Sequence, residues 1–257
     1  MQKVVSQKLS KHNNLIQGLA IGDFGHLKFG DDGSENNIEK VVENRKKYFD
    51  IFGIDLKKVV MQNQVHGTHI SLVSKKDCGK GVFSPDSYID NSDGLVTKDK
   101  NVFLVCYTAD CLPVTFFDPK LKICGIAHSG WKGTLGNISG KMIGEFKKMG
   151  SNVLDIIVYI GPAIGKCCYE VSEAKDDRIK LFENLAKEFK ADNFVVKEND
   201  KIYLDLKRIV KTELLDSGVK NENIEISKIC TSCDDKFPSY HRDKDFKSDL
   251  LSVIGMK

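Results

Sequence analysis

Apolar positions along the chain follow two periodicities, one typical of helices and one typical of buried strands. From Ile38 to Phe52 apolar side chains recur at helical spacing and Gly53 follows them, which predicts a helix that ends at that glycine. The same spacing predicts helices over 133–149, 172–189 and 205–217. Short apolar runs bounded by turn residues predict strands over 59–65, 69–73, 102–107, 113–117, 121–127, 153–160 and 224–229.

Two of the predicted strands are joined by a short turn, which indicates the kind of sheet. Asp118, Pro119 and Lys120 separate the runs 113–117 and 121–127 and are typical of a hairpin turn. An antiparallel hairpin argues against a purely parallel, doubly wound sheet. We therefore expect a mixed α/β (α+β) fold, in which one mixed sheet or two sheets pack with helices as a single domain over residues 1–257.

Composition narrows the class of protein. A chain of 257 residues with 41% hydrophobic and 29% charged residues can bury a core without a disulfide or a metal. The net charge is only +3, so no nucleic-acid partner is expected. No apolar run is long enough to span a membrane, and the N-terminus lacks the apolar segment of a signal peptide. We expect a cytoplasmic monomer or small homo-oligomer that binds no membrane.

The eight cysteines are then expected to be reduced, and each is a core residue, a metal ligand or a nucleophile. Cys230 and Cys233 form a C-x-x-C motif, which could be a redox pair or half of a zinc site, but no second C-x-x-C or H-x-x-H lies at the spacing of a zinc ribbon. We therefore interpret these two as loop cysteines. Cys167 and Cys168 are adjacent and do not easily form a disulfide with each other.

Three candidate metal ligands stand in matching places. His66, Cys111 and His128 each come after an apolar run, and ligands of α/β proteins collect beyond the carboxyl ends of strands. Two imidazoles and one thiolate suit zinc, and an open fourth position marks a catalytic rather than a structural site. The alternative is that each is an ordinary core or loop residue, as a single His or Cys at a strand end most often is.

The segment 128–134 reads His-Ser-Gly-Trp-Lys-Gly-Thr and joins a predicted strand to a predicted helix. Small residues allow backbone amides to approach a ligand, and a helix N-terminus offers unpaired N–H groups. With Lys132 beside them, these groups predict a phosphate site next to the metal. A plain strand-to-helix turn with a solvated lysine is the alternative.

Six segments, kept in order along the chain, carry a family resemblance. They read Gln-Val-His-Gly at 64–67, Asp-Gly-Leu-Val-Thr at 93–97, Thr-Ala-Asp-Cys-Leu-Pro-Val at 108–114, His-Ser-Gly-Trp-Lys-Gly at 128–133, Ile-Gly-Pro-Ala-Ile-Gly at 160–165 with Cys-Tyr-Glu-Val at 168–171, and Ser-Tyr-His-Arg-Asp at 239–243. Asn44-Arg45 also fits. With these motifs the chain resembles the YfiH-type family, described as multicopper polyphenol oxidoreductases or laccase-like proteins and as peptidoglycan editing factors, and regarded as purine nucleoside phosphorylases with adenosine deaminase activity.

The resemblance implies a YfiH-like fold and a catalytic zinc bound by His66, Cys111 and His128, with copper as a substitute ion. It implies phosphorolysis of adenosine, inosine or methylthioadenosine by inorganic phosphate, which yields the base and ribose 1-phosphate, and deamination of adenosine. The deaminase motif H-x-E is absent, so Asp110 and Asp93 are the candidate general acids or bases, and Cys111, His128 and Asp110 are the expected catalytic residues. The residues expected around substrate or phosphate are Arg45, Gln64, Lys132 and Arg242.

The chain departs from the family pattern at the expected anion site. The Thr-Arg usual near the start is missing from 18–26, and the Gly-Arg usual near the end is missing from 244–252. His241 stands where the first of two arginines follows Ser-Tyr. These changes remove positive charge and leave the three candidate metal ligands intact.

Three other functions stay open. Cys111 could act as a nucleophile with His128 as its base, in a metal-free cysteine hydrolase. Weak copper-dependent oxidation of phenols at the same three ligands is another, although six histidines are too few for a multicopper cluster. A binding protein without catalysis is the third.

Overall fold

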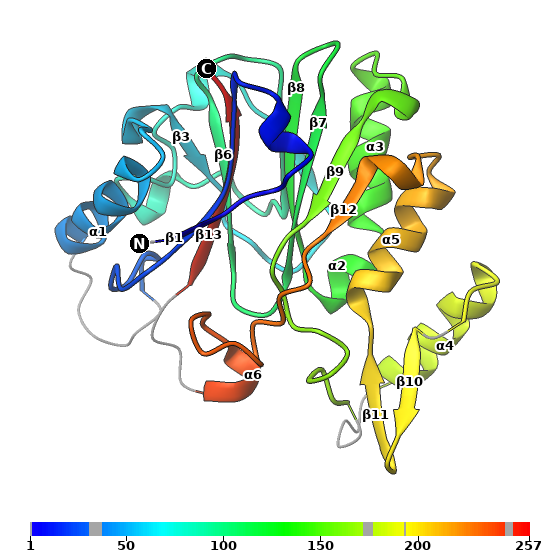
Figure 1. Ribbon diagram of the computed structural model, residues 1–257. Helices are drawn as coiled ribbons and strands as arrows, with labels where there is room; N and C mark the ends of the chain where they lie inside the picture. The colour runs from blue at the N-terminus through cyan, green and yellow to red at the C-terminus, as the bar shows by residue number, and fades with distance from the viewer. Residues whose placement is uncertain (1, 31–37, 172–176, 193, 245–248) are drawn as a thin grey trace.

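Two β-sheets lie face to face, with helices on their outer surfaces (Figure 1). The computed structural model describes residues 2–30, 38–171, 177–192, 194–244 and 249–257. The first sheet has the strand order β1 (Gln2–Val4), β2 (Leu15–Ile21), β13 (Leu250–Met256), β6 (Phe103–Thr108) and β3 (Val59–Met61). The second has the order β12 (Ile224–Ile226), β9 (Ile157–Ile160), β7 (Leu112–Asp118), β8 (Ile123–Ser129), β5 (Gly94–Thr97) and β4 (Ile70–Leu72).

Helices cover both sheets. Their bounds are α1 (Ile38–Asp50), α2 (Trp131–Leu135), α3 (Ile138–Lys148), α4 (Arg178–Glu188), α5 (Leu206–Asp216) and α6 (Tyr240–Asp243), and β10 (Val195–Glu198) pairs with β11 (Lys201–Leu204) in a separate hairpin. Helix α1 lies outside the first sheet, and α3 and α5 lie outside the second (Figure 1). Within the described ranges, no helix has the length and apolar character that crossing a membrane requires.

Three apolar layers fill the spaces between these elements. Leu104 of β6 and Ile126 of β8 belong to the layer between the sheets, Phe49 to the layer under α1, and Phe146 to the layer under α3, and all four are fully buried. Strand β6 is buried over its whole length because the second sheet covers one face and α1 the other. Its apolar run is continuous for the same reason.

The predicted mixed α/β fold is confirmed. Strands β7 and β8 pair as an antiparallel hairpin from Leu112↔Ser129 to Asp118↔Ile123, as the turn residues indicate. Other pairs in the same sheet are parallel, such as β9 with β12 and β4 with β5. The helix predicted from Ile38 is α1, and it ends three residues before Gly53.

Several predicted elements differ in extent. The helix predicted over 133–149 is two helices, because Asn137 has φ +55° and caps α3 by accepting a bond from Gly140 N. The strand predicted over 59–65 ends at Met61. The predicted start of the helix over 172–189 lies outside the described residues, and α4 begins at Arg178. The sequence patterns did not predict β1, β2, β5, β10, β11 or β13.

Candidate metal centre

The three candidate metal ligands come together at one place. His66 lies in the loop after β3, Cys111 in the turn between β6 and β7, and His128 near the carboxyl end of β8. One ligand atom of each lies within 4.8 Å of the others. The site therefore joins the two sheets, since β3 and β6 belong to the first and β8 to the second. The set of two nitrogens and one sulfur matches a zinc site with an open position.

The backbone around the ligands is unusual. His66 has φ +59° and Asp110, which precedes Cys111, has φ +83°. Residues other than glycine rarely adopt positive φ, and such conformations gather at functional sites. Gly130 faces the ligands, because a Cβ atom there would lie 3.1 Å from Cys111 Sγ and 3.1 Å from His66 Cδ2. The motif glycine thus leaves room for the ligand side chains.

Asp93 holds two of the three ligands from behind. Its Oδ1 lies 2.8 Å from His128 Nδ1, and the same carboxylate accepts bonds from the backbone N–H groups of Val65, His66 and Gly67 at 3.1, 3.0 and 2.7 Å. Because Nδ1 of His128 is bonded to Asp93, its Nε2 is left to face the ligand cluster. Burial alone would raise the pKa of Asp93, but the bonds from His128 and Gly67 lower it.

The charges of Cys111 and His128 support each other. Burial works to raise the pKa of Cys111, but the neighbouring His128 imidazolium lowers it to about 6. Burial works to lower the pKa of His128, but the Cys111 thiolate and Asp93 raise it to about 9. The imidazole beside Cys111 thus favours the thiolate, which is the form that binds metals and attacks electrophiles.

A cavity of about 450 Å³ opens beside the ligands. Besides the three ligands, it is lined by Lys28, Gln62, Asn63, Gln64, Tyr88, Tyr107, Thr108, Ala109, Tyr240 and Asp249. This size is typical of sites that bind small molecules. A larger cavity of about 660 Å³ adjoins it and shares Ala109, Tyr240 and Asp249 with it.

Among the described residues, two buried polar side chains in the cavity wall have no hydrogen-bond partner. The amide nitrogen and oxygen of Gln62 and the hydroxyl of Thr108 form no hydrogen bond within the described residues, although they are 1% and 3% exposed. Unpaired buried polar groups are costly, so their presence points to a ligand that completes them. We did not predict either residue. A polar Gln62 that interrupts the apolar run 59–65 is the signal that could have found it.

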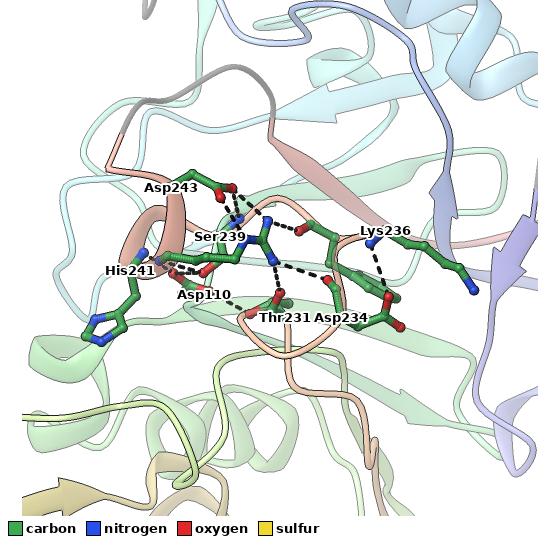
Figure 2. Close-up of polar contacts among 9 residues, drawn as sticks. Asp110, Thr231, Asp234, Lys236, Ser239, His241 and Asp243 are labelled. Carbon is green, nitrogen blue, oxygen red and sulfur yellow. Dashed lines mark hydrogen bonds and ion pairs between the residues drawn. The ribbon is translucent and has the colours of Figure 1, made fainter.

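Gln64 and Asp110 support the cavity rather than point freely into it. The Gln64 side chain bonds both the N–H and the carbonyl of Tyr107, at 2.7 and 2.9 Å. Asp110 accepts bonds from Thr231 Oγ1, Ser239 Oγ and His241 N at 2.6, 3.0 and 2.7 Å (Figure 2). These bonds fasten the segment 231–241 to the turn that carries Cys111.

The three predicted phosphate-shell cations lie outside this cavity. Arg45 is fully buried, and its five N–H groups donate to Leu27 O, Gly81 O, Val82 O, Tyr88 OH and Tyr107 OH. Arg242 donates to Thr231 O, Asp234 O and Phe237 O and to both oxygens of Asp243. Lys132 is exposed on α2 and does not line the cavity. The structure therefore does not bring these three cations to the metal ligands.

Known proteins share both the sequence and the fold. A family model described as multi-copper polyphenol oxidoreductase laccase matches residues 15–257. The chain is 37% identical over 219 residues to purine nucleoside phosphorylase YlmD of Bacillus subtilis (strain 168). The aligned residues cover 84% of this chain and 77% of that protein. The chain is 28% identical over 184 residues to adenosine deaminase RL5 of an unknown prokaryotic organism, over 71% of this chain and 68% of that protein.

The crystal structure of Bacillus licheniformis hypothetical protein YfiH has a TM-score of 0.85 and 36% sequence identity to this chain, over 95% of this chain and 94% of that one. Sequence motifs, family model and fold agree. The chain belongs to the multi-copper polyphenol oxidoreductase laccase family, as the resemblance of its sequence motifs predicts.

Proposed function

We propose that this protein is a zinc-dependent purine nucleoside phosphorylase that also deaminates adenosine. The single observation that carries the proposal is the convergence of His66, Cys111 and His128 beside a cavity with unpaired polar groups. The names of the relatives support the reaction class, since one is a purine nucleoside phosphorylase and another an adenosine deaminase.

The residues fit a zinc ion. Two imidazoles and a thiolate are the ligand types that zinc prefers, and Asp93 orients His128 as carboxylates commonly orient metal-bound histidines. Zinc bound there supplies Lewis-acid chemistry, because a divalent cation stabilises negative charge that develops on nearby atoms. Gly130 leaves room for the Cys111 and His66 side chains, because a Cβ atom there would lie 3.1 Å from an atom of each.

The cavity wall fits a nucleoside. A purine carries both hydrogen-bond donors and acceptors on its edge, and the Gln62 amide offers one of each without a partner in the described parts of the chain. Thr108 adds a hydroxyl that can donate or accept. The rings of Tyr88 and Tyr107 line the same cavity and offer apolar surface to a flat base or a ribose.

In phosphorolysis a phosphate oxygen forms a bond to C1′ of the ribose while the bond from C1′ to N9 of the purine breaks. The electron pair of that bond moves onto the purine, where a hydrogen bond donated by the Gln62 amide would stabilise the charge, and the purine then takes up the proton that the phosphate gives up. Lys28 lines the cavity and brings a positive charge for the phosphate. The predicted role of Arg45 and Arg242 at the phosphate becomes a positioning role, because their donors already hold Tyr88, Tyr107 and the segment 231–243.

The test is product identification with the purified full chain loaded with zinc. We expect hypoxanthine and ribose 1-phosphate from inosine only when phosphate is present, and inosine from adenosine without phosphate. Cys111→Ala should abolish both reactions, and Cys78→Ala, outside the site, should keep them. Absence of both reactions in the zinc-loaded wild type would refute the proposal.

A second candidate function rests on the thiolate. Cys111, His128 and Asp93 also match the nucleophile, base and orienting acid of a cysteine hydrolase. His66 argues for the metal, because a hydrolase needs one imidazole at its sulfur and this site has two. Alkylation by iodoacetamide distinguishes a zinc enzyme from a metal-free cysteine hydrolase. Zinc should protect Cys111 from alkylation in a metal enzyme, whereas a free nucleophile reacts at once.

A further inference from the structure

Four cysteines that the proposed reaction does not use come together on the second sheet's side of the molecule. Cys167 and Cys168 follow β9, and Cys230 and Cys233 follow β12. Strands β9 and β12 are parallel neighbours, so the segments that follow them leave the sheet at the same end, beyond the carboxyl ends of the two strands. The four Sγ atoms all lie within 4.8 Å of one another.

Cys230 and Cys233 lie in a loop, as the sequence predicts, but that loop lies against the segment that carries Cys167 and Cys168. In the described parts of the chain between the two pairs lie α4, the hairpin of β10 and β11, α5 and β12, so the spacing of the four cysteines along the sequence does not show that they meet. The backbone keeps the segments in register beyond the strands. Ala163 and Cys230 form an isolated parallel bridge, and Thr231 N donates to Ala163 O at 3.2 Å.

We propose that Cys167, Cys168, Cys230 and Cys233 bind one zinc ion at a structural site separate from the catalytic centre. Four sulfurs that each lie ~2.3 Å from a tetrahedral zinc stand ~3.8 Å apart. Cys233 Sγ lies 3.3 Å from Cys168 Sγ and 3.5 Å from Cys167 Sγ, which is close to that separation. It is well beyond the ~2.05 Å of a disulfide.

The chemistry around the sulfurs fits a bound thiolate cluster. Gly165 N donates to Cys230 Sγ at 3.2 Å, and a hydrogen bond from a backbone N–H stabilises a thiolate. The Lys207 side chain is held beside the cluster by bonds to Ser227 O and Ile229 O, and its charge attracts Cys230 and Cys167. Four thiolates around a divalent ion carry net negative charge, which this ammonium offsets.

The ligand set indicates a single closed site. Four thiolates fill the four positions of zinc and leave none for a substrate, so the site is structural. An iron–sulfur cluster would place several inorganic atoms between the thiolates and separate them further than 4.8 Å. Soft thiolate ligands select zinc over the hard cations magnesium and calcium.

The site would brace the catalytic centre. Thr231, next to Cys230, donates to Asp110 Oδ1 at 2.6 Å, and Ile164 N donates to Asp110 O at 3.0 Å. Asp110 precedes the catalytic ligand Cys111. A metal that ties segment 163–168 to segment 230–233 therefore holds two of the groups that donate to Asp110, Thr231 Oγ1 and Ile164 N.

Metal stoichiometry of the full chain tests the proposal. Native mass spectrometry should show two zinc ions per wild-type chain purified under reducing conditions. Cys233→Ser and Cys167→Ser should each lose one, Cys111→Ala should lose the other, and Cys78→Ser should keep both. Cobalt substitution in Cys111→Ala should give the visible absorption of a tetrahedral tetrathiolate site, which Cys233→Ser abolishes.

Two results would overturn the proposal. One is a single zinc ion in the wild type that is lost in Cys111→Ala and kept in Cys233→Ser. The other is a disulfide between Cys233 and Cys167 or Cys168 in chain purified anaerobically under reducing conditions. If either variant fails to fold, cobalt substitution of the wild type decides, because a wild-type chain without the absorption of a tetrathiolate site would also overturn the proposal. A chain with two zinc ions and no nucleoside activity would refute only the proposed function.

Discussion

Replacing Asp93 by asparagine tests how the metal centre is built. Oδ1 of Asp93 accepts bonds from His128 Nδ1 and His66 N, and Oδ2 accepts bonds from Val65 N and Gly67 N. An amide keeps only one acceptor oxygen. Two of the four donors therefore lose their acceptor, and they face an NH2 group in either orientation of the amide. With the amide NH2 at the Oδ1 position, His128 Nδ1 and His66 N lose their acceptor, and with the NH2 at the Oδ2 position, Val65 N and Gly67 N lose theirs.

We expect Asp93→Asn to weaken zinc binding at His66, Cys111 and His128 by about 10–100-fold, or about 1.4–2.7 kcal/mol. Each buried donor left without an acceptor also costs about 1–3 kcal/mol of folding free energy. Zinc affinity is measured by competition with a chromophoric chelator. The zinc ion bound by His66, Cys111 and His128 is identified as the one that Cys111→Ala lacks. Chemical denaturation gives the stability of the same samples.

Asp118→Asn is the matched control. Asp118 is also buried, but Lys120 N and Leu121 N both donate to one of its oxygens, which an amide retains. It should leave zinc affinity unchanged. Unchanged zinc affinity in Asp93→Asn, with the protein folded, would refute the idea that Asp93 orients the ligands.

Three further predictions follow from single positions. Gly130→Ala should lower zinc affinity at least ~10-fold, because its methyl group meets Cys111 Sγ and His66 Cδ2, whereas Gly144→Ala, whose Cβ meets nothing within 4 Å, should not change it. Gln62→Leu should raise KM for inosine about 10-fold without lowering the melting temperature, because it removes an unpaired buried amide; a fall in stability with unchanged KM would contradict this. Burial raises the pKa of Glu213 to about 9, above its unfolded value, so stability is full at low pH and falls as pH rises from about 4.5 toward 9, by about 3 kcal/mol at pH 7. Denaturation at about pH 5 and about pH 8 should show a smaller fall for Glu213→Gln, and equal falls would contradict the assignment.

The convergence of the three candidate metal ligands could be predicted from the sequence, because each follows an apolar run and the three runs end in the same region of the fold. The position of a residue in the sequence does not show whether the hydrogen-bond donors of its side chain are already bonded within the protein. The resemblance implies that Arg45 lies near the phosphate, but its five N–H groups all donate hydrogen bonds to other groups of the protein. The sequence does not identify Gln62 as a site residue, because the residues packed around its amide determine whether it finds a hydrogen-bond partner.

Long-range pairing explains the other differences. Strand β13 lies between β2 and β6, so its place depends on partners far away in the sequence. Cys230 and Cys233 meet Cys167 and Cys168 only because β9 and β12 are parallel neighbours. The break between α2 and α3 is local, but it depends on Asn137 adopting φ +55°, which helical periodicity does not register.

In the proposed function, His66, Cys111 and His128 bind one divalent ion beside the cavity that takes the nucleoside. Anomalous diffraction at the zinc edge, from crystals of active enzyme grown without chelator, tests it most directly. We predict a peak between Cys111 Sγ and the two imidazoles. No peak there in crystals whose dissolved enzyme still produces ribose 1-phosphate would contradict the account.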